Sequence, residues 1–312
     1  MTTPYKVSNS ELQTFKQCKR KWYFAYYLRL KPRAVKVTGP LALGSRVHEA
    51  LDQHDTTGIN LLEAYSKLLA VDKQIAEDNF LPMDKVESEG ELGRIMLEGY
   101  QDWAAEEGLD AAFELVSTEE ILSMPMYEGA VELQGKLDRR VRRKSDGVRL
   151  FSDYKTCMRF GDIEETAQIN EQILTYMLLE QAQNKPGEHS SGGLFTLLKK
   201  VKRTANAKPP FYRQFEVHHN DFTLRNFWQH VHGVVGDLMR TKNALDQGAD
   251  HHFVAYPTVT KDCTWKCEFF TVCGMMDDGS DVDRALDDLY EVHDPYDYYA
   301  DGKTDTPAEE AE

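Results

Sequence analysis

The stretch VELQGKLDRRVRRKSDGVRLFSDYKT, residues 131–156, predicts a β-hairpin around which the rest of the chain can be ordered. Apolar and polar residues alternate on both sides of Asp146-Gly147, a dipeptide typical of two-residue hairpin turns of type I′. Such a turn would place Asp138 opposite Lys155 on the neighbouring strand. The hairpin therefore carries acidic and basic side chains into its paired region.

Asp153 occurs two residues before Lys155 on the same predicted strand, so the two side chains share one face. Diagonal neighbours on adjacent strands lie about 7–8 Å apart, which brings the carboxylates of Asp138 and Asp153 near the Lys155 ammonium. A turn longer by one residue would move these side chains to opposite faces, so the inference depends on the turn. The hairpin thus predicts one polar patch with two carboxylates and one ammonium.

The remaining sequence alternates between helical and strand patterns, which indicates an α/β fold. Ser8 and Glu11 form a predicted capping box at the start of a first helix, which continues to about residue 30. A second helix, GSRVHEALDQ, carries His48. Further helices are expected at roughly 60–75, 89–107, 165–183 and 221–245, and strands at 113–126, 192–200 and 211–219. Gln172 and Tyr176 lie one turn apart on one of these helices.

Charge is unevenly distributed along the chain. The formal net charge is −15 over 312 residues, which by itself argues against a nucleic-acid-binding protein. Residues 276–312 carry 14 acidic and 2 basic residues, whereas residues 1–46 carry 10 basic residues and one acidic residue. A basic patch acts locally, because salt screens charges beyond about 10 Å. The first part can therefore contact nucleic acid, and the last part is expected to be a largely disordered acidic tail. DRALDDLYEVHDPYDYY, residues 283–299, is a partial exception, because Leu286, Leu289, Tyr290 and Val292 could form a short amphipathic helix that docks on this protein or on a partner. A solvating tail with no specific role is the alternative.

The N-terminal residues lack an apolar signal segment, and no run of about 18 apolar residues occurs, which predicts a cytoplasmic protein. Disulfides are rare in the reducing cytosol, and clustered cysteines there more often bind metal. Three of the five cysteines fall within CTWKCEFFTVC, residues 263–273, with the spacing C-x3-C-x5-C. Sites with four thiolates suit both an iron–sulfur cluster and tetrahedral zinc.

The order of these motifs resembles the PD-(D/E)XK nuclease superfamily in its RecB-type branch. The similar segments are GSRVHEAL, GKLDRRV, FSDYKT and QILTYMLLE, and SNSELQTFKQCKRKWYFAYYLRL resembles the start of iron–sulfur members of that branch. Those members include the AddB nuclease domain, CRISPR-associated iron–sulfur exonucleases and phage RecB-like exonucleases. The resemblance covers roughly residues 7–275. It implies a restriction-endonuclease-like core, in which a central mixed sheet is flanked by helices and closed by an iron–sulfur cluster.

The resemblance also implies a [4Fe–4S] cluster held by one N-terminal and three C-terminal cysteines. The matching positions here are Cys18, Cys263, Cys267 and Cys273. The usual C-terminal spacing of the family is C-x2-C-x5-C, whereas the first interval here is one residue longer. This departure keeps a zinc site open as the alternative. Cys157 is expected to be a buried free thiol.

The resemblance implies six residues of an active site: His48, Asp138, Asp153, Lys155, Gln172 and Tyr176. His48 and the two aspartates would bind catalytic Mg²⁺ or Mn²⁺, and Lys155 would orient or activate the attacking water. Gln172 and Tyr176 would position that water or the DNA backbone. The simpler alternatives are an ordinary ion pair on a strand for the D-x-K motif, and helix packing for Gln172 and Tyr176.

These observations predict one nuclease domain over residues 1–275, followed by the acidic tail over 276–312. The predicted activity is metal-dependent DNA cleavage, exonucleolytic on single-stranded or end-containing DNA, in recombination, repair or DNA processing. Two alternatives stay open: a non-catalytic iron–sulfur module that binds DNA ends, and a structure-specific endonuclease. The chain has no G-x-x-x-x-G-K-[ST] motif, so a helicase, recombinase or single-strand-binding protein would be a separate partner. No membrane partner is expected.

Overall fold

The computed structural model describes residues 3–183, 187 and 189–299. The chain forms two compact units, each built from segments that lie far apart in the sequence. The first unit combines the described parts of Met1–Ala34, Ile121–Lys136 and Arg225–Glu312, and the second combines those of Val35–Glu120 and Leu137–Leu224. Two long strands, β3 (Phe113–Met126) and β4 (Val131–Arg143), contribute residues to both units and pair with each other.

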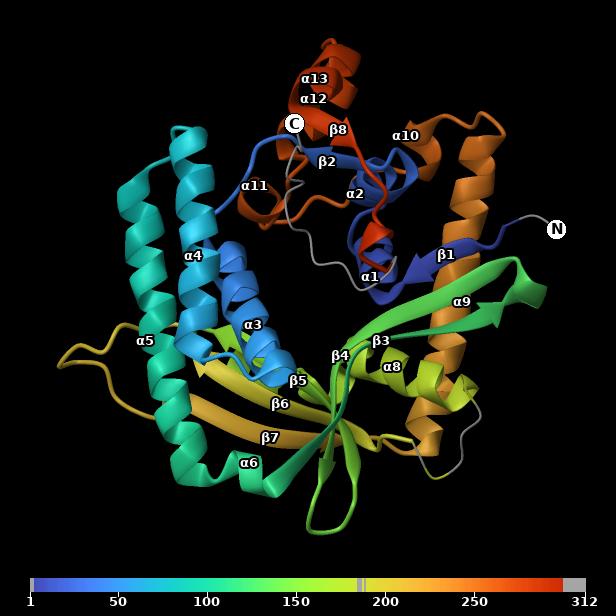
Figure 1. Ribbon diagram of the computed structural model, residues 1–312. Helices are drawn as coiled ribbons and strands as arrows, with labels where there is room; N and C mark the ends of the chain where they lie inside the picture. The colour runs from blue at the N-terminus through green and yellow to red at the C-terminus, as the bar shows by residue number, and fades with distance from the viewer. Residues whose placement is uncertain (1–2, 184–186, 188, 300–312) are drawn as a thin grey trace, which may run out of the picture. The chain divides into compact units, whose positions relative to one another are not determined.

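The second unit contains a mixed sheet in which β4 is followed by β5, β6 and β7 (Figure 1). These strands are β5 (Arg149–Cys157), β6 (Gly192–Lys199) and β7 (Tyr212–His218). β5 pairs antiparallel with β4 and parallel with β6, and β6 pairs antiparallel with β7. Parallel neighbours need a crossover, and the connection from β5 to β6 contains α8 (Glu171–Ala182). The predicted mixed sheet with flanking helices is therefore confirmed.

Three long helices of the second unit pack on one another (Figure 1). They are α3 (Pro40–Thr57), α4 (Leu61–Asp78) and α5 (Met83–Glu107). Their apolar faces form one buried cluster with Tyr154 of β5, Leu198 of β6 and Tyr212 of β7. Gly93 of α5 lies against the Tyr65 hydroxyl of α4, where any Cβ would clash, so glycine permits this close approach. The three helices thus cover one face of the sheet.

The β4–β5 hairpin differs from the prediction in register. Arg139 pairs with Ser152, and the backbone N–H of Arg143 donates to the Val148 carbonyl over 2.8 Å. The loop therefore spans residues 144–147 and is longer than the two-residue turn expected. The register shifts by two positions, an even number, so positions 138, 153 and 155 still belong to one face of the sheet.

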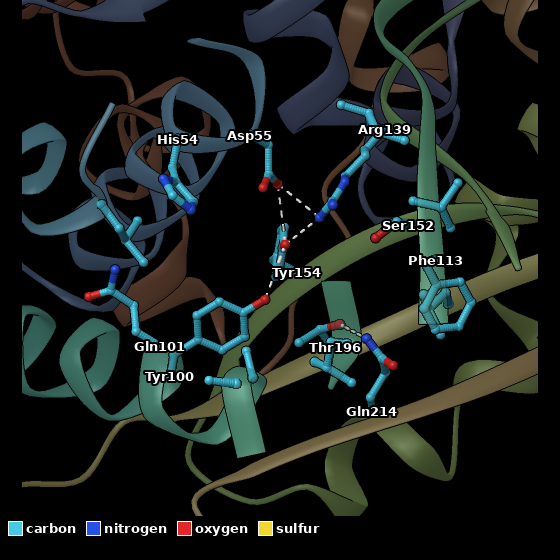
Figure 2. Close-up of a pocket in the computed structure, with 17 residues that line it drawn as sticks. His54, Asp55, Tyr100, Gln101, Phe113, Arg139, Ser152, Tyr154, Thr196 and Gln214 are labelled. Carbon is cyan, nitrogen blue, oxygen red and sulfur yellow. Dashed lines mark hydrogen bonds and ion pairs between the residues drawn. The ribbon is translucent and has the colours of Figure 1, made fainter. Parts of the chain in front are cut away.

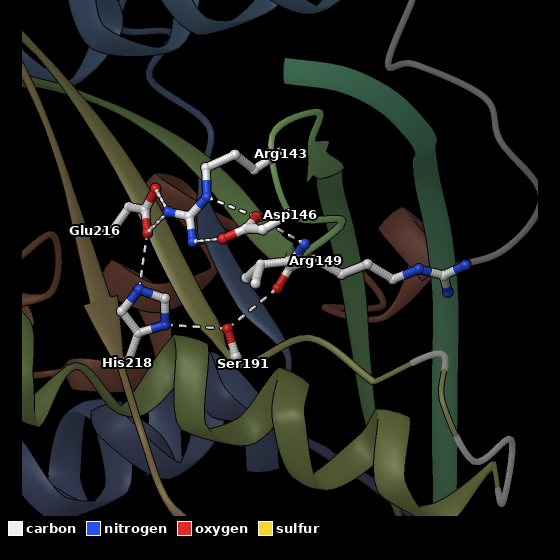
Figure 3. Close-up of polar contacts among 7 residues, drawn as sticks. Arg143, Asp146, Arg149, Ser191, Glu216 and His218 are labelled. Atoms are coloured by element: carbon white, nitrogen blue, oxygen red, sulfur yellow. Dashed lines mark hydrogen bonds and ion pairs between the residues drawn. The ribbon is translucent and has the colours of Figure 1, made fainter. Parts of the chain in front are cut away.

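The side chain of Asp146 accounts for the longer loop (Figure 3). Its carboxylate accepts two N–H groups of the Arg143 guanidinium, at 2.9 and 2.8 Å, and the backbone N–H of Val148 at 3.2 Å. The same guanidinium reaches both oxygens of Glu216 on β7, at 2.5 and 2.6 Å, and Glu216 also contacts His218 (Figure 3). Asp146 thus closes the loop through its side chain rather than as part of a tight turn.

In the first unit, β1 (Tyr5–Ser8) pairs in parallel with the first part of β4. The single helix predicted to follow is broken at Cys18. Its pieces are α1 (Asn9–Gln17), α2 (Lys19–Trp22) and a π-helical turn, η1 (Tyr23–Tyr27). Cys18 has an extended backbone, with φ −161° and ψ 112°, and its Sγ accepts the backbone N–H of Lys21 at 3.5 Å. The sulfur therefore caps a new helix at this position.

Glu11 at the start of α1 is fully buried. Its backbone N–H donates to Ser8 Oγ at 3.3 Å, as the predicted capping box requires. Its carboxylate instead accepts the Tyr5 hydroxyl at 2.6 Å, the Trp22 indole N–H at 2.8 Å and the Tyr296 hydroxyl. Burial raises the pKa of Glu11, and the three donors partly oppose this rise. This carboxylate ties the beginning of the chain to residues near its end.

Residues 276–299 differ from the largely disordered tail that the composition suggests. They include the end of α12 (Phe270–Asp278), α13 (Val282–Leu289), β8 (Tyr290–Val292) and a 3-10 turn, η4 (Asp297–Tyr299). β8 pairs antiparallel with β2 (Leu30–Pro32), and Tyr290 is buried in a cluster with Phe24 and Phe269. Aromatic and aliphatic residues among the acidic ones thus pack this segment against the rest of the first unit. The prediction for residues 300–312 lies outside the described residues.

The remaining elements are short connections, apart from one long helix of 26 residues, α9 (Asp221–Asp246). They are α6 (Leu109–Ala112), η2 (Tyr127–Gly129), α7 (Gly161–Glu164), η3 (Ala167–Ile169), α10 (His251–Val254) and α11 (Cys263–Lys266). Within the described ranges, none of the helices combines the length and the apolar character that a bilayer crossing would require.

Candidate functional site

Asp153 and Lys155 lie on the same face of β5 in the second unit. Asp153 is only 6% exposed, and the Lys155 Nζ lies 2.8 Å from its Oδ2. Among the described residues, neither carboxylate oxygen of Asp153 has a well-directed hydrogen bond. A buried carboxylate in this state is costly unless a cation compensates it. The two carboxylate oxygens of Asp153 therefore fit a divalent cation bound beside Lys155.

Asp138 lies on β4 next to Arg139, the residue that pairs with Ser152 of β5. If the pairing of Arg139 with Ser152 is extended by one residue along both strands, the backbone of Asp138 lies opposite that of Asp153. The predicted two-residue turn would place Asp138 opposite Lys155 instead. The side chain of Asp138 lies outside the described part of the structure. The strand positions of the two aspartates are thus as close as the predicted patch requires.

His48 lies on α3, half-buried, with its ring 6.3 Å from the Tyr154 ring and perpendicular to it. Burial lowers the pKa of His48, the carboxylate of Asp153 opposes this shift, and the ammonium of Lys155 adds to it. The imidazole is therefore within electrostatic range of both predicted partners. A neutral imidazole is the form that binds metal ions.

Gln172 and Tyr176 lie on α8. Gln172 Nε2 donates to the Tyr176 hydroxyl at 2.9 Å. The Tyr176 ring packs edge-on against Phe151 of β5, with 5.6 Å between the ring centroids. Phe151 and Asp153 alternate onto the same face of the strand, so α8 covers the face that carries the carboxylate. Both predicted residues thus lie on the side of the sheet that carries Asp153.

The opposite face of β5 lines a cavity of about 350 Å³ (Figure 2). Asp55 lies 2.8 Å from the Arg139 guanidinium and accepts the Tyr154 hydroxyl at 3.3 Å. Arg139 also donates to the Tyr154 hydroxyl, whose oxygen is 3.3 Å from that of Tyr100. Arg139 and Tyr154 directly follow Asp138 and Asp153 in the sequence, so this network fixes the two strands behind the predicted carboxylates.

Sequence reasoning missed this network. Arg139 directly follows the predicted metal ligand Asp138, and Tyr154 directly follows Asp153. Because alternate residues of a strand point to opposite faces, this adjacency was the sequence feature that could have indicated the network. Asp55 carried no signal, because it lies beyond His48 on α3 and meets the strands only through tertiary packing.

The four predicted cysteine ligands all lie in the first unit, and all are free thiols of intermediate exposure. The Sγ of Cys18 accepts backbone N–H groups of Lys21 at 3.5 Å and Thr258 at 3.4 Å. The Sγ of Cys263 accepts the backbone N–H of Thr260 at 3.3 Å. Backbone N–H groups directed at sulfur stabilise a thiolate, which is the form that binds metal.

Three of these cysteines interact electrostatically. Burial raises the pKa of Cys267 and of Cys273, and in both cases the charge of Cys18 adds to the rise. Arg20 opposes the rise at Cys273, and its guanidinium donates to the Cys273 carbonyl at 3.3 Å. The charge of Lys21 likewise opposes the rise in the pKa of Cys267. The segment after α1 and the segment around α12 thus bring sulfurs and cations into one region.

Cys157 belongs to the sheet of the second unit. It is buried at the end of β5, and burial raises the pKa of its thiol. These properties agree with the predicted buried free thiol.

A search of the curated proteins finds no match to this chain. Among solved structures, one described as "Crystal structure of SSO0001" is similar at 12% identity and a TM-score of 0.36, and covers 88% of each chain. A similarity of this size supports no argument about function.

A family model gives the decisive comparison. The model of the PD-(D/E)XK nuclease superfamily matches residues 6–274, which is most of the chain. The matched residues include the strands and helices that carry Asp153, Lys155 and His48. The mixed sheet flanked by helices is consistent with the restriction-endonuclease-like fold. Members of this superfamily are generally nucleases that use divalent metal ions such as Mg²⁺ or Mn²⁺. This chain belongs to the PD-(D/E)XK nuclease superfamily.

Proposed function

We propose that this chain is a metal-dependent deoxyribonuclease that cleaves DNA exonucleolytically from single-stranded or duplex ends. The observation that carries the proposal is the buried carboxylate of Asp153, which has Lys155 at 2.8 Å and no well-directed hydrogen bond among the described residues. Such a carboxylate suits an oxygen ligand of Mg²⁺ or Mn²⁺. A structural ion pair would more commonly have its oxygens satisfied by hydrogen bonds.

In this proposal, His48, Asp138 and Asp153 hold the divalent cation. When bound, the cation supplies charge neutralisation at the scissile phosphate and lowers the pKa of a bound water. Lys155 orients the attacking water and stabilises negative charge on the phosphate through its ammonium group. Gln172 and Tyr176 position the DNA backbone or the water from α8. The Asp55–Arg139–Tyr154 network holds β4 and β5 in the register that this geometry needs.

We also propose that Cys18, Cys263, Cys267 and Cys273 bind a [4Fe–4S] cluster in the first unit. Support comes from the backbone N–H groups directed at the sulfurs of Cys18 and Cys263. Hydrogen bonds to sulfur are a feature of iron–sulfur sites. Tetrahedral zinc is the alternative, because it accepts the same four thiolates. Measured acid-labile sulfide separates the two, since only the cluster contains it.

The proposed domain extends over residues 1–275, with DNA as substrate and with a role in recombination, repair or DNA processing in the cytoplasm. A helicase, recombinase or single-strand-binding protein would be the natural partner, because an exonuclease needs an accessible end. The second candidate is a structure-specific endonuclease. The third is a non-catalytic module that binds DNA ends, but such a module has no need of a buried metal-binding carboxylate.

Digestion of matched DNA substrates tests the proposal. End-labelled linear single strands, linear duplex and covalently closed circles should be incubated with the purified chain and Mg²⁺ or Mn²⁺, with a chelator as control. The exonuclease proposal predicts loss of both linear substrates, or of the single strand alone, with the circle intact. Cleavage of the circle would favour the endonuclease. Absence of cleavage of every substrate, with DNA-end binding retained, would favour the non-catalytic module.

A further inference from the structure

The pair His251-His252 opens the short helix α10, and Asp250 caps that helix by accepting the backbone N–H of His252 at 2.8 Å. This segment lies in the first unit, between α9 and the cysteines at 263–273. Neither the proposed active site nor the proposed iron–sulfur site uses these side chains.

One ligand atom from each of Asp250, His251 and His252 lies within 4.8 Å of the other two. Asp250 Oδ1 and His252 Nδ1 are 2.9 Å apart. Zinc–ligand bonds of about 2.0–2.1 Å place neighbouring ligand atoms of a tetrahedral site a little more than 3 Å apart. Small rotations of the exposed Asp250 and His252 side chains toward the partly buried His251 ring would therefore suffice to surround an ion.

The second nitrogen of His252 is already oriented as in a metal site. Its Nε2 lies 3.1 Å from the Met276 carbonyl oxygen, to which it can donate its hydrogen. With no ion bound, the Nδ1–H of His252 donates to Asp250 Oδ1 at 2.9 Å, so a metal ion would replace the Nδ1 proton and leave the Nε2–H on the Met276 carbonyl. A histidine ligand of a metal commonly donates its other N–H to a backbone carbonyl in this way.

His251 supplies the observation that is hardest to explain without a ligand. Its Nδ1 is buried and has no hydrogen-bonding partner among the described residues. Its ring lies 4.1 Å from that of His252 and 5.3 Å from that of Tyr23, measured between centroids. A buried polar atom of this kind ordinarily has a partner, or faces a water or an ion.

We propose that Asp250, His251 and His252 form a second metal site, which binds a divalent transition-metal ion of the Zn²⁺ class. Two imidazoles and one carboxylate favour Zn²⁺, Ni²⁺ or Cu²⁺ over Mg²⁺ and Ca²⁺, which prefer all-oxygen sites. Three protein ligands leave the fourth tetrahedral position to water. Asp277 of α12 lies 3.4 Å from His252 Nε2 and adds negative charge nearby.

The bound ion would tie α10 to α12. His252 contacts the carbonyl of Met276 on α12, and Arg20 pairs with Asp277 at 2.6 Å and with the Cys273 carbonyl at 3.3 Å. An ion at Asp250 would therefore restrict both ends of the segment that holds the last three cysteines. The site is independent of the proposed nuclease activity.

The test measures metal binding directly, without an activity assay. The purified full chain, as isolated, is titrated with Zn²⁺ by calorimetry and with Co²⁺ followed by visible absorption. We expect one equivalent of Co²⁺ with the weak bands of nitrogen and oxygen ligands. Intense sulfur-to-cobalt charge-transfer bands alone would show that the cysteines are the only binding site and would overturn the proposal.

Two variants and a matched control complete the experiment. His251→Ala removes the unpartnered nitrogen, and Asp250→Asn keeps the helix cap but removes the charged ligand. Each should weaken Zn²⁺ binding at least about tenfold, as even outer partners of metal sites contribute 10–100-fold. His219→Ala is the control, because His218-His219 is the other His-His pair and His219 also has an unpartnered buried nitrogen. Unchanged affinity in His251→Ala, or no binding by the parent chain, would leave only an ion pair between His252 and Asp250 and overturn the proposal.

Discussion

The Lys155 ammonium and the Asp153 carboxylate lie 2.8 Å apart on one face of β5, and the carboxylate is almost completely buried. In this arrangement the cation of Lys155 compensates only part of the cost of burying the anion, because neither oxygen has a well-directed hydrogen bond among the described residues. A second positive charge, such as a bound metal ion, would therefore stabilise the buried carboxylate. Metal binding and the stability of the fold are then expected to be linked.

Replacing the Asp153 carboxylate should greatly slow DNA cleavage without lowering the stability of the fold. Asp153→Asn should lower the rate of DNA cleavage at least about 1,000-fold, because loss of a metal ligand costs several kcal/mol of transition-state stabilisation. Its melting temperature without metal should be equal to or above that of the parent chain, since a poorly compensated buried charge is removed. Glu63→Gln, in an exposed ion pair of α4, is the control and should leave both quantities unchanged. Parent-like cleavage by Asp153→Asn would exclude the assignment of this metal ligand.

Divalent metal should stabilise the chain through the same carboxylate. Adding Mg²⁺ or Mn²⁺ should raise the melting temperature, because a ligand that binds only the folded state stabilises it. The rise should disappear in Asp153→Asn and persist in Glu63→Gln. Thermal melts with and without a chelator measure it. An equal rise in both variants would place the stabilising metal elsewhere in the chain.

The network behind the strands should contribute to stability. Tyr154→Phe keeps the ring but removes the hydroxyl that contacts Asp55, Arg139 and Tyr100, so we expect a loss of about 1–3 kcal/mol in the free energy of unfolding. Urea denaturation of Tyr154→Phe, Asp55→Asn and the double variant measures it. If the two losses simply add, the residues do not act as one network.

The buried carboxylate of Glu11 should make stability depend on pH. Its pKa is raised above the ordinary value of 4.5, so its stabilising contribution is complete below pH 4.5 and is lost as pH rises through the raised value. Glu11→Gln should therefore be more stable relative to the parent chain as pH increases above 4.5. The difference in unfolding free energy between the two proteins, measured by urea denaturation across pH, shows this. A difference that is independent of pH would mean that the pKa of Glu11 is not raised.

Loss of a cluster ligand should be measurable by metal analysis. The purified chain should contain about four iron and four acid-labile sulfide per molecule, as a [4Fe–4S] cluster requires. Cys18→Ala and Cys267→Ala should each lose most of both, because they would bind one centre, whereas Cys157→Ser should retain them. Stoichiometric zinc without sulfide in the parent chain would instead identify the tetrahedral zinc alternative.

The sequence predicts the hairpin and the shared face of Asp153 and Lys155 because strand periodicity is local. It misplaces the register by two positions, because the side chain of Asp146 bonds to Arg143 and closes a longer loop than the dipeptide suggests. Because the shift is an even number of positions, the backbone positions 138, 153 and 155 stay on one face of the sheet, and the patch itself stays a prediction. Such side-chain closure depends on partners such as Glu216, which is far away in the sequence.

Composition alone predicts a disordered tail at 276–299, whereas the spacing of Leu286, Leu289 and Tyr290 indicates a short docking helix, and α13 lies there. Its acidic residues dominate any average over the window, whereas much of its packing comes from two tyrosines and a few aliphatic residues. Tyr290 is buried beside Phe269, and Tyr296 donates to the Glu11 carboxylate near the beginning of the chain. Contacts between the two ends of a chain leave no periodic signal in either segment.

The extended backbone of Cys18 has a consequence for protein engineering. Its sulfur begins α2 by accepting the Lys21 N–H, a role that asparagine and aspartate fill well in other helices. A substitution to asparagine would thus conserve the local backbone while it removes the soft ligand that iron prefers. One substitution at this position would thus give a protein without the proposed cluster whose first helices still form, so that the contribution of any bound metal to the rest of the fold can be measured alone.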